Sequence, residues 1–134
     1  MTNSKAKGKR GELEVVQLIK EHTGIEAHRN WLEQSAQGGV DIVGVPGWAI
    51  EVKRQKKWLG KWWTQAAQQA KDGNKPVLLY KLDRKPWRAQ VCSCALGSEL
   101  HFMVTTDILN WLHLVRHERL GKAVLQVRDT QAHL

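Results

Sequence analysis

Apolar and polar positions near the start of the chain alternate with the period of a helix. Apolar side chains recur at roughly helical spacing from Leu13 onwards, which predicts an amphipathic helix over residues 8–22 that ends near Gly24. Residues 25–32 then favour a first strand. The following residues, 33–39, are polar and rich in glycine, which is typical of a loop.

The centre of the chain carries two apolar runs that predict a hairpin. Residues 40–45 and 48–54 are the best strand-forming segments, and the Pro46-Gly47 pair between them is a turn signal. Residues 61–71, which are rich in Ala and Gln, then predict a helix, closed by the polar turn sequence at 72–74.

The second half of the chain predicts two further strands and a last helix. Residues 76–81 and 87–94 have the apolar content of strands, and a basic turn joins them. Thr105 or Thr106 can cap a helix that runs to about His117, and the residues after it show no clear period.

Size and charge narrow the class of protein. The order of elements and the length of 134 residues predict one mixed α/β domain over residues 1–134. Lys and Arg outnumber Asp and Glu by 21 to 13, and the net charge of +8 favours nucleic acid or an anionic membrane surface as partner. No apolar run approaches the roughly 20 residues that span a bilayer, and the N-terminus lacks the apolar stretch of a secretory signal. We therefore expect a cytoplasmic protein in which Cys92 and Cys94 are free thiols, because a lone CxC pair suits neither a disulfide framework nor a zinc site.

Charged residues interrupt both strands of the predicted hairpin. Asp41 lies within an aliphatic run, and Glu51 and Lys53 alternate with aliphatic residues on the second strand. Residues two apart in a strand share a face, so a hairpin that pairs around the Pro46-Gly47 turn brings Asp41 and Glu51 together with Lys53 beside them. A solvated strand face would also explain the Glu51–Lys53 pair. An Asp in an aliphatic run is harder to explain in this way, because a buried carboxylate needs a partner.

Two neighbouring carboxylates point to a cation. They repel each other unless a cation lies between them, and hard oxygen ligands suit Mg²⁺, which typically binds through one or two carboxylates together with a substrate phosphate. Lys53 would then orient the attacking water or stabilise charge on the phosphate. This set of residues predicts phosphodiester hydrolysis.

Three short motifs, in this order along the chain, carry a resemblance to a known family. KGKRGE begins at Lys7 at the head of the first helix, GGVDIVG follows over residues 38–44, and IEVK over residues 50–53. Together they resemble the PD-(D/E)XK nuclease superfamily and, more narrowly, its small Holliday junction resolvases of archaea and phages. The sequence LYKLDRKPW, residues 79–87, is similar to the phage branch, so the resemblance extends from residue 7 to about residue 90. Val40 replaces the proline of the PD motif, which leaves the ligand Asp in place.

The resemblance implies a fold, a reaction and a set of residues. The implied fold is the restriction-endonuclease-like core, an αβββαβ arrangement with a mixed sheet flanked by helices. The implied activity is structure-selective, Mg²⁺-dependent cleavage of branched DNA, with Mn²⁺ as an alternative ion. Asp41 and Glu51 would be the metal ligands, Lys53 the catalytic lysine, and a first-helix glutamate an auxiliary acid. Glu12 fits that last role better than Glu14, because it follows Gly8 at the family spacing and shares the inward helix face with Val15 and Ile19.

Basic residues on both sides of the motifs would hold DNA. Such residues neutralise phosphates without reading sequence, and the expected contacts are Lys7, Lys9, Arg10, Arg54, Lys56 and Lys57. Ser35 in the polar loop would help grip the backbone, although a surface loop without such a role is the alternative. Trp58, Trp62 and Trp63 follow the basic run; they would either stack on unpaired bases or belong to the core or a dimer interface.

The predicted function is resolution of four-way (Holliday) junctions by a homodimer, because two symmetric cuts call for a twofold arrangement. If the chain is phage-encoded, it would act in the cytoplasm of the bacterial host. One alternative is a nuclease of the same chemistry for flaps, nicked DNA or a specific duplex sequence. Another is a DNA-binding module that keeps the fold without cleaving.

Overall fold

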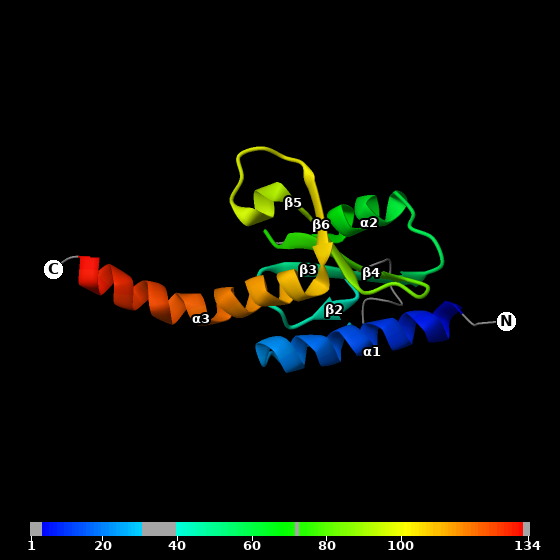
Figure 1. Ribbon diagram of the computed structural model, residues 1–134, viewed down its shortest axis with the longest axis horizontal. Coiled ribbons are helices and arrows are strands. Elements are labelled where there is room, and N and C mark those ends of the chain that lie inside the picture. Colours follow the sequence, from blue (N-terminus) through cyan, green and yellow to red (C-terminus); the bar gives the residue numbers. More distant parts are fainter. Residues whose placement is uncertain (1–3, 31–39, 72, 133–134) are drawn as a thin grey trace.

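The computed structural model describes residues 4–30, 40–71 and 73–132, with side chains described for 6–30, 40–71 and 73–120. The elements follow the order α1 (Ser4–Thr23), β1 (His28–Arg29), β2 (Ile42–Val43), β3 (Trp48–Gln55), α2 (Lys61–Gln69), β4 (Lys75–Leu82), β5 (Arg88–Cys92), the short 3-10 helix η1 (Ser93–Leu96), β6 (Met103–Asp107) and α3 (Ile108–Ala132) (Figure 1). Among these residues no helix is both long and apolar enough to cross a bilayer.

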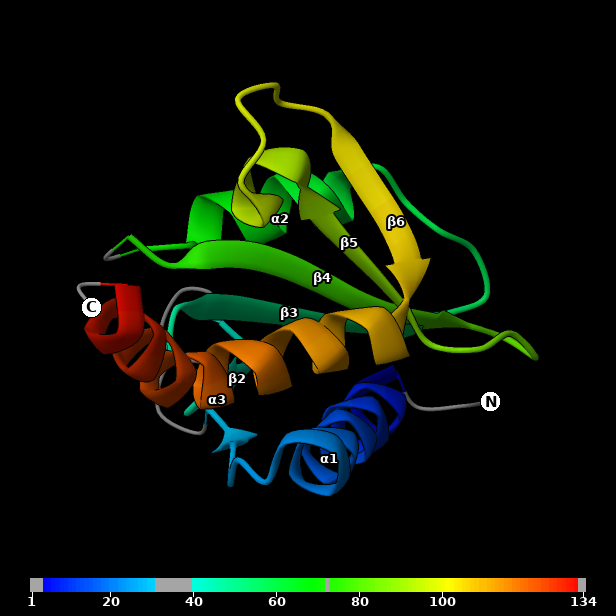
Figure 2. The ribbon, with the colours of Figure 1, turned by 60° about the vertical axis from the view of Figure 1, so that its left-hand side comes forward.

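The six strands form one mixed sheet in the order β1-β2-β3-β4-β5-β6 (Figure 2). Only β3 and β4 run parallel, and their register joins all eight residues of each strand, from Trp48 opposite Lys75 to Gln55 opposite Leu82. A parallel pair needs a crossover connection, and α2 supplies it. All other neighbouring strands pair antiparallel.

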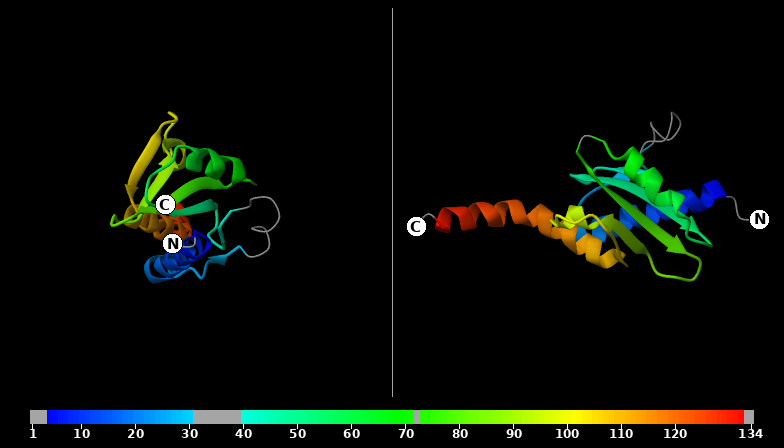
Figure 3. Two further views of the ribbon diagram at one scale, coloured as in Figure 1. Left: turned by 90° about the vertical axis from the view of Figure 1, so that its right-hand side faces the viewer. Right: turned by 90° about the horizontal axis from the view of Figure 1, so that it is seen from above.

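Helices cover both faces of the sheet, with α1 and α3 on one face and α2 on the other (Figure 3, left). Alternate residues of β3 and β4 therefore enter different cores. The larger core joins α1, the sheet and α3 through Val15, Ile19, Ile50, Val52, Val77, Leu79, Trp111, Leu112 and Val115. The smaller one packs Trp62 and Ala66 of α2 on Leu78 and Tyr80 of β4. This alternation turns Glu51 and Lys53 of β3 toward the α2 face.

The predicted fold class is confirmed, since the first six elements run αβββαβ in a mixed sheet flanked by helices. The first helix, the hairpin, the helix after it and the two following strands are all present. The edge strand β1 and its neighbour β2 are each only two residues long, shorter than the sequence pattern indicates. The predicted loop at 33–39 lies outside the described residues.

The prediction for the C-terminal third is wrong in two places. Thr105 and Thr106 do not cap a helix, because residues 103–107 form β6 and pair antiparallel with β5. The cap is Asp107, whose Oδ1 accepts a hydrogen bond from the Leu109 N–H at 2.8 Å. The helix that follows continues to Ala132 and extends past the sheet (Figure 1).

The second error concerns the cysteines. Cys94 lies in η1 rather than in a strand, because β5 ends at Cys92. The two side chains therefore do not occupy adjacent positions on one strand face. Neither Cys92 nor Cys94 forms a disulfide bond.

Candidate active site

The hairpin of β2 and β3 brings Asp41 next to Glu51. Trp48 N donates to Val45 O at 3.3 Å across the turn, where Gly47 has φ +81°, a conformation that favours glycine. Ile42 then pairs with Ile50, which places Asp41 opposite Glu51. The Asp41 N–H donates to Ile50 O at 2.9 Å, and Asp41 Oδ2 accepts from the Val52 N–H at 2.8 Å. Backbone hydrogen bonds on both sides thus fix the Asp41 carboxylate against β3.

Glu51 is buried with one of its two oxygens unsatisfied. Its side chain is 6% exposed, and Oε1 lies 3.3 Å from Lys53 Nζ. Oε2 is buried and has no hydrogen-bond partner among the residues that the structure describes. Buried polar atoms of this kind are rare and call for an explanation such as an ion or an ordered water.

Both carboxyl groups hold their protons more tightly than usual. Burial, followed by the charge of Asp41, raises the pKa of Glu51 from 4.5 to about 8, although Lys53 lowers it in part. Burial also raises the pKa of Asp41, against the hydrogen bond from Val52, and the charge of Glu12 raises it further. Ionisation of both carboxyl groups at neutral pH therefore costs free energy unless a cation compensates their charge.

The residues fit a divalent cation with oxygen ligands. Asp41 and Glu51 offer two adjacent carboxylates that share a hydrogen bond only while one of them holds a proton, and Glu51 Oε2 meets no other donor among the described residues. A bound cation would satisfy this oxygen and reverse the cost of ionisation. Asp41 and Glu51 are thus the residues that could hold a metal.

The two glutamates of α1 have different surroundings. Glu12 is buried, its Oε2 lies 3.1 Å from Arg29 Nε, and it is close enough for its charge to raise the pKa of Asp41. Glu14 instead accepts hydrogen bonds from Arg54 Nη1 at 2.6 Å and Trp87 Nε1 at 3.0 Å. Of the two acids, only Glu12 has a charge that raises the pKa of Asp41.

The residues expected to contact DNA fall into three groups. Lys9, Arg10, Lys56 and Lys57 are exposed, the first two on α1 and the others directly after β3. Lys7 is bound to Asp83 at 2.9 Å and Arg54 to Glu14, so both cations have a protein partner. Ser35 lies outside the described residues.

The three tryptophans after β3 have different environments. Trp62 is buried against Tyr80 in the smaller core, with ring centroids 6.1 Å apart, and Trp63 packs beside this core. Trp58 is 43% exposed and directly follows the basic run at 56–57. Of the two roles that the sequence left open, core packing holds for Trp62, and exposure keeps Trp58 available for contact with a base.

Sequence reasoning missed two residues, in β1 and directly after it, that support the site. Arg29 holds Glu12, and Asn30 holds the backbone around Asp41 through two hydrogen bonds of 3.0 Å, to Val40 O and Asp41 O. A buried acid on the first helix implies a nearby cation. The sequence offers many cations, however, and only the register of β1 with β2 selects Arg29.

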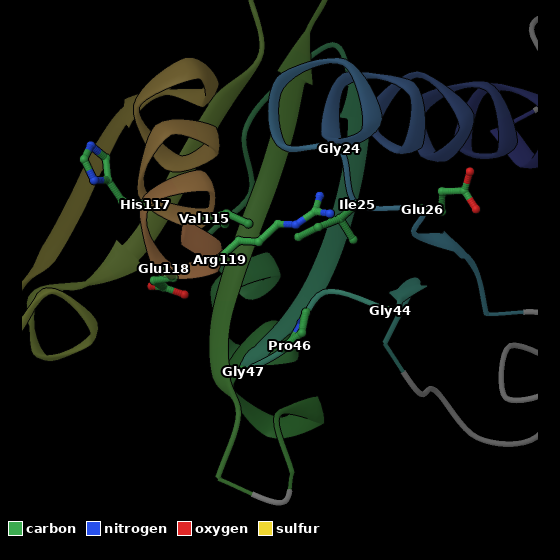
Figure 4. A pocket seen from close by; sticks show the side chains of 10 residues that line it. All are labelled: Gly24, Ile25, Glu26, Gly44, Pro46, Gly47, Val115, His117, Glu118 and Arg119. Carbon is green, nitrogen blue, oxygen red and sulfur yellow. The ribbon is translucent and has the colours of Figure 1, made fainter. Parts of the chain in front are cut away.

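A pocket of about 900 Å³ lies away from these carboxylates, between the end of α1, the β2–β3 turn and α3 (Figure 4). Arg119 reaches across it and donates to Thr23 O at 2.6 Å. Neither Asp41, Glu51 nor Lys53 is among its lining residues. The candidate active site is therefore separate from this pocket.

Comparisons with known proteins identify a nuclease family and a shared fold. A family model described as "Phage putative PDDEXK endonuclease" matches residues 3–106. Protein D14 of Escherichia phage T5 is 29% identical over 109 aligned residues, which cover 63% of this chain and 68% of that protein. The solved structure of Hjc, a Holliday junction resolvase from the archaeal hyperthermophile Archaeoglobus fulgidus, shares the fold with a TM-score of 0.54 and 22% identity, over 80% of this chain and 96% of that one. PD-(D/E)XK nucleases generally use divalent metals. The chain belongs to the phage PD-(D/E)XK endonuclease family.

Proposed function

We propose that this chain is a Mg²⁺-dependent endodeoxyribonuclease that resolves four-way DNA junctions by paired phosphodiester hydrolysis. The observation that carries the proposal is the buried Glu51 beside the half-buried Asp41, with an unsatisfied Glu51 oxygen and Lys53 next to it. A non-catalytic DNA-binding module would have no use for a charge arrangement that opposes its own stability.

Each residue of the site has a distinct task in this proposal. Asp41 and Glu51 would hold Mg²⁺, which when bound supplies Lewis-acid polarisation of the scissile phosphate. Mn²⁺ would serve the same ligands. Lys53 is 26% exposed and can donate hydrogen bonds toward the substrate side, where it would orient the attacking water or stabilise charge on the phosphate. Glu12 would act as the auxiliary acid, positioned by Arg29.

The exposed cations would bind the DNA backbone. Lys9 and Arg10 near the start of α1, and Lys56 and Lys57 after β3, form no ion pair with another described residue, so DNA would displace no such contact. Lys7 and Arg54 would contact phosphate only by leaving Asp83 and Glu14. The first four residues are therefore the stronger candidates.

The choice of a junction as substrate is supported by likeness. The archaeal protein that shares the fold is a Holliday junction resolvase, and fold alone does not determine substrate. A nuclease for flaps, nicked DNA or a specific duplex sequence would use the same residues. We propose a homodimer for the junction activity, because paired cuts need two active sites related by a twofold axis, and we place this activity in the cytoplasm of the bacterial host.

The decisive experiment is cleavage of a labelled, immobile four-way junction in Mg²⁺ beside a linear duplex of the same sequences. Asp41→Asn and Lys53→Ala would abolish cleavage and keep DNA binding, because they remove a metal ligand and the catalytic cation. Glu26→Gln is the matched control, since that carboxylate is 82% exposed and lies in the wall of the separate pocket. Paired symmetric cuts in the junction alone would support the resolvase.

Other outcomes lead to different conclusions. Equal cleavage of junction and duplex would keep the nuclease and exclude junction selectivity. Binding without cleavage under Mg²⁺ or Mn²⁺ would leave the DNA-binding module. A cruciform plasmid adds a test of the dimer, because paired cuts in one binding event give linear product directly, whereas independent cuts first accumulate nicked circles.

A further inference from the structure

A second group of metal-binding side chains lies at the other edge of the sheet. Cys92 ends β5, Cys94 lies in η1, and His101 precedes β6. Their ligand atoms all lie within 4.8 Å of one another, and this is the one group of three or more Cys, His or acidic side chains with that property among the described residues. Two thiols and an imidazole form a soft ligand set, unlike the carboxylates at Asp41 and Glu51.

A buried serine holds the three side chains in place. Ser93, between the two cysteines, is 3% exposed. Its Oγ donates to Leu100 O at 2.5 Å and accepts from the Phe102 N–H at 3.0 Å, so it binds both neighbours of His101. A third hydrogen bond runs from Ser93 N to Phe102 O at 2.7 Å. The residue between the cysteines thus fixes the backbone on both sides of the histidine.

The cysteines themselves are arranged by the local backbone. The Cys94 N–H donates to Cys92 Sγ at 3.3 Å, and Gly97, with φ +89°, closes η1 behind them. A backbone N–H directed at a sulfur stabilises the thiolate form that binds metal. This turn therefore presents Cys92 and Cys94 toward the same point.

The spacing is close to what zinc requires. Zn–S bonds of about 2.3 Å and Zn–N bonds of about 2.0 Å in a tetrahedron separate the ligand atoms by roughly 3.5–3.8 Å. Cys92 Sγ and His101 Nδ1 lie 4.0 Å apart. All ligand atoms of the group lie within 4.8 Å of one another, and rotations of the exposed Cys94 and His101 side chains would close the difference.

The surrounding segment is held by hydrogen bonds of Ser93 more than by an apolar core. Leu96, Leu100 and Phe102 are 50%, 70% and 55% exposed, so burial of apolar side chains contributes little to its stability. A metal that joins the end of β5 to His101 would add a cross-link to the Ser93 hydrogen bonds.

We propose that Cys92, Cys94 and His101 bind one Zn²⁺ ion, with solvent in the fourth position, and that this ion fixes the segment between β5 and β6. The site is distinct from the nuclease site, because β5 and β6 lie at the opposite edge of the sheet from β2 (Figure 2). It uses no residue proposed for cleavage.

Cobalt(II) titration of the reduced full-length chain, in millimolar Mg²⁺, tests the site directly. We expect one equivalent of Co²⁺ to produce a thiolate-to-metal charge-transfer band in the near ultraviolet, and Zn²⁺ to abolish it. The Cys92→Ser/Cys94→Ser double variant should lose the band. His101→Ala removes a direct ligand and should raise the Zn²⁺ Kd at least about tenfold. Loss of a residue that only hydrogen-bonds to a ligand already weakens metal binding about 10- to 100-fold. His113→Ala is the matched control, as this histidine is exposed on α3, and should leave the Kd unchanged.

Several results would overturn the proposal. The proposal fails if no charge-transfer band appears or if Mg²⁺ displaces Co²⁺. It also fails if His101→Ala leaves the Zn²⁺ Kd unchanged, because the site would then be adventitious binding by two thiols. Zn²⁺ should also raise the Tm of the wild type and not that of the double variant. The double variant should keep Mg²⁺-dependent cleavage, so failure of the zinc site is distinguishable from failure of the nuclease proposal.

Discussion

Ionisation of Glu51 should destabilise the metal-free protein as the pH rises. Burial and the neighbouring Asp41 raise the pKa of Glu51 from 4.5 to about 8. Between these values the folded chain keeps a proton that the unfolded chain releases. The contribution of Glu51 to stability is therefore fully present below the unfolded pKa and is lost as the pH increases through the folded pKa. This is the opposite of the behaviour of a carboxylate stabilised by a salt bridge.

The size of the effect follows from the difference between the two pKa values. One pKa unit corresponds to about 1.4 kcal/mol, so Glu51 sets an upper limit of about 5 kcal/mol on the loss of unfolding free energy. Water that enters the site upon ionisation relieves part of this cost, as in other buried ionised groups. We therefore expect the free energy of unfolding to fall by about 2–3 kcal/mol between about pH 5 and about pH 9 in EDTA.

Glu51→Gln isolates this contribution, because it removes the titrating group at nearly unchanged volume. Urea unfolding, followed by fluorescence of buried tryptophans such as Trp62, would be measured for both proteins across this pH range. The variant should match the wild type at the acid end and exceed it by about 2–3 kcal/mol at the alkaline end. Added Mg²⁺ should restore the wild type and have less effect on the variant. Parallel pH profiles of the two proteins in EDTA would refute the reasoning.

Three further predictions concern the helices and the basic surface. A Cβ at Gly8 would meet no atom within 4 Å. Gly8→Ala should therefore raise the free energy of unfolding by up to about 1 kcal/mol, measured as a higher urea midpoint. A lowered midpoint would contradict the open packing at this position. Asp107→Ala removes the cap on Leu109 N and should lower the free energy of unfolding by about 1 kcal/mol in thermal melts, whereas Asp107→Asn should retain most of it. Lys56→Ala and Lys57→Ala should each reduce the slope of log K against log salt for junction binding by about one, and an unchanged slope would exclude phosphate contact at that residue.

The hairpin and its acids could be predicted because their information is local. Alternation along residues 48–54 and the Pro46-Gly47 turn determine which side chains share a face, and the register of Ile42 with Ile50 follows from the turn. The proximity of Asp41 and Glu51 required no knowledge of the rest of the chain. Burial of Glu12 was likewise readable from its helical phase relative to Val15.

What the sequence could not provide depends on distant contacts. The strand at 103–107 pairs only with β5 at the edge of the sheet, so its two threonines are equally consistent with helix caps. The choice of Arg29 as partner of Glu12, and of Arg54 as partner of Glu14, requires the packing of α1 on the sheet. His101 joins the cysteine pair only because Ser93 folds the intervening segment back on itself.

The expected instability of the metal-free site and its proposed affinity for a cation would have one cause. Exposed carboxylates would keep ordinary pKa values, stay hydrated and bind Mg²⁺ weakly, whereas burial of Glu51 removes the competing water and leaves Oε2 without a partner. The long parallel pairing of β3 with β4 and the cores on both faces of these strands offset the free energy that burial of Glu51 costs. Because Ile50 and Val52 on the opposite face of β3 anchor the strand in the larger core, Glu51 cannot turn outward to escape its neighbour without breaking that packing. A bound cation is the change that relieves the repulsion while the fold stays intact, and this is why stability, pH and metal should vary together in this protein.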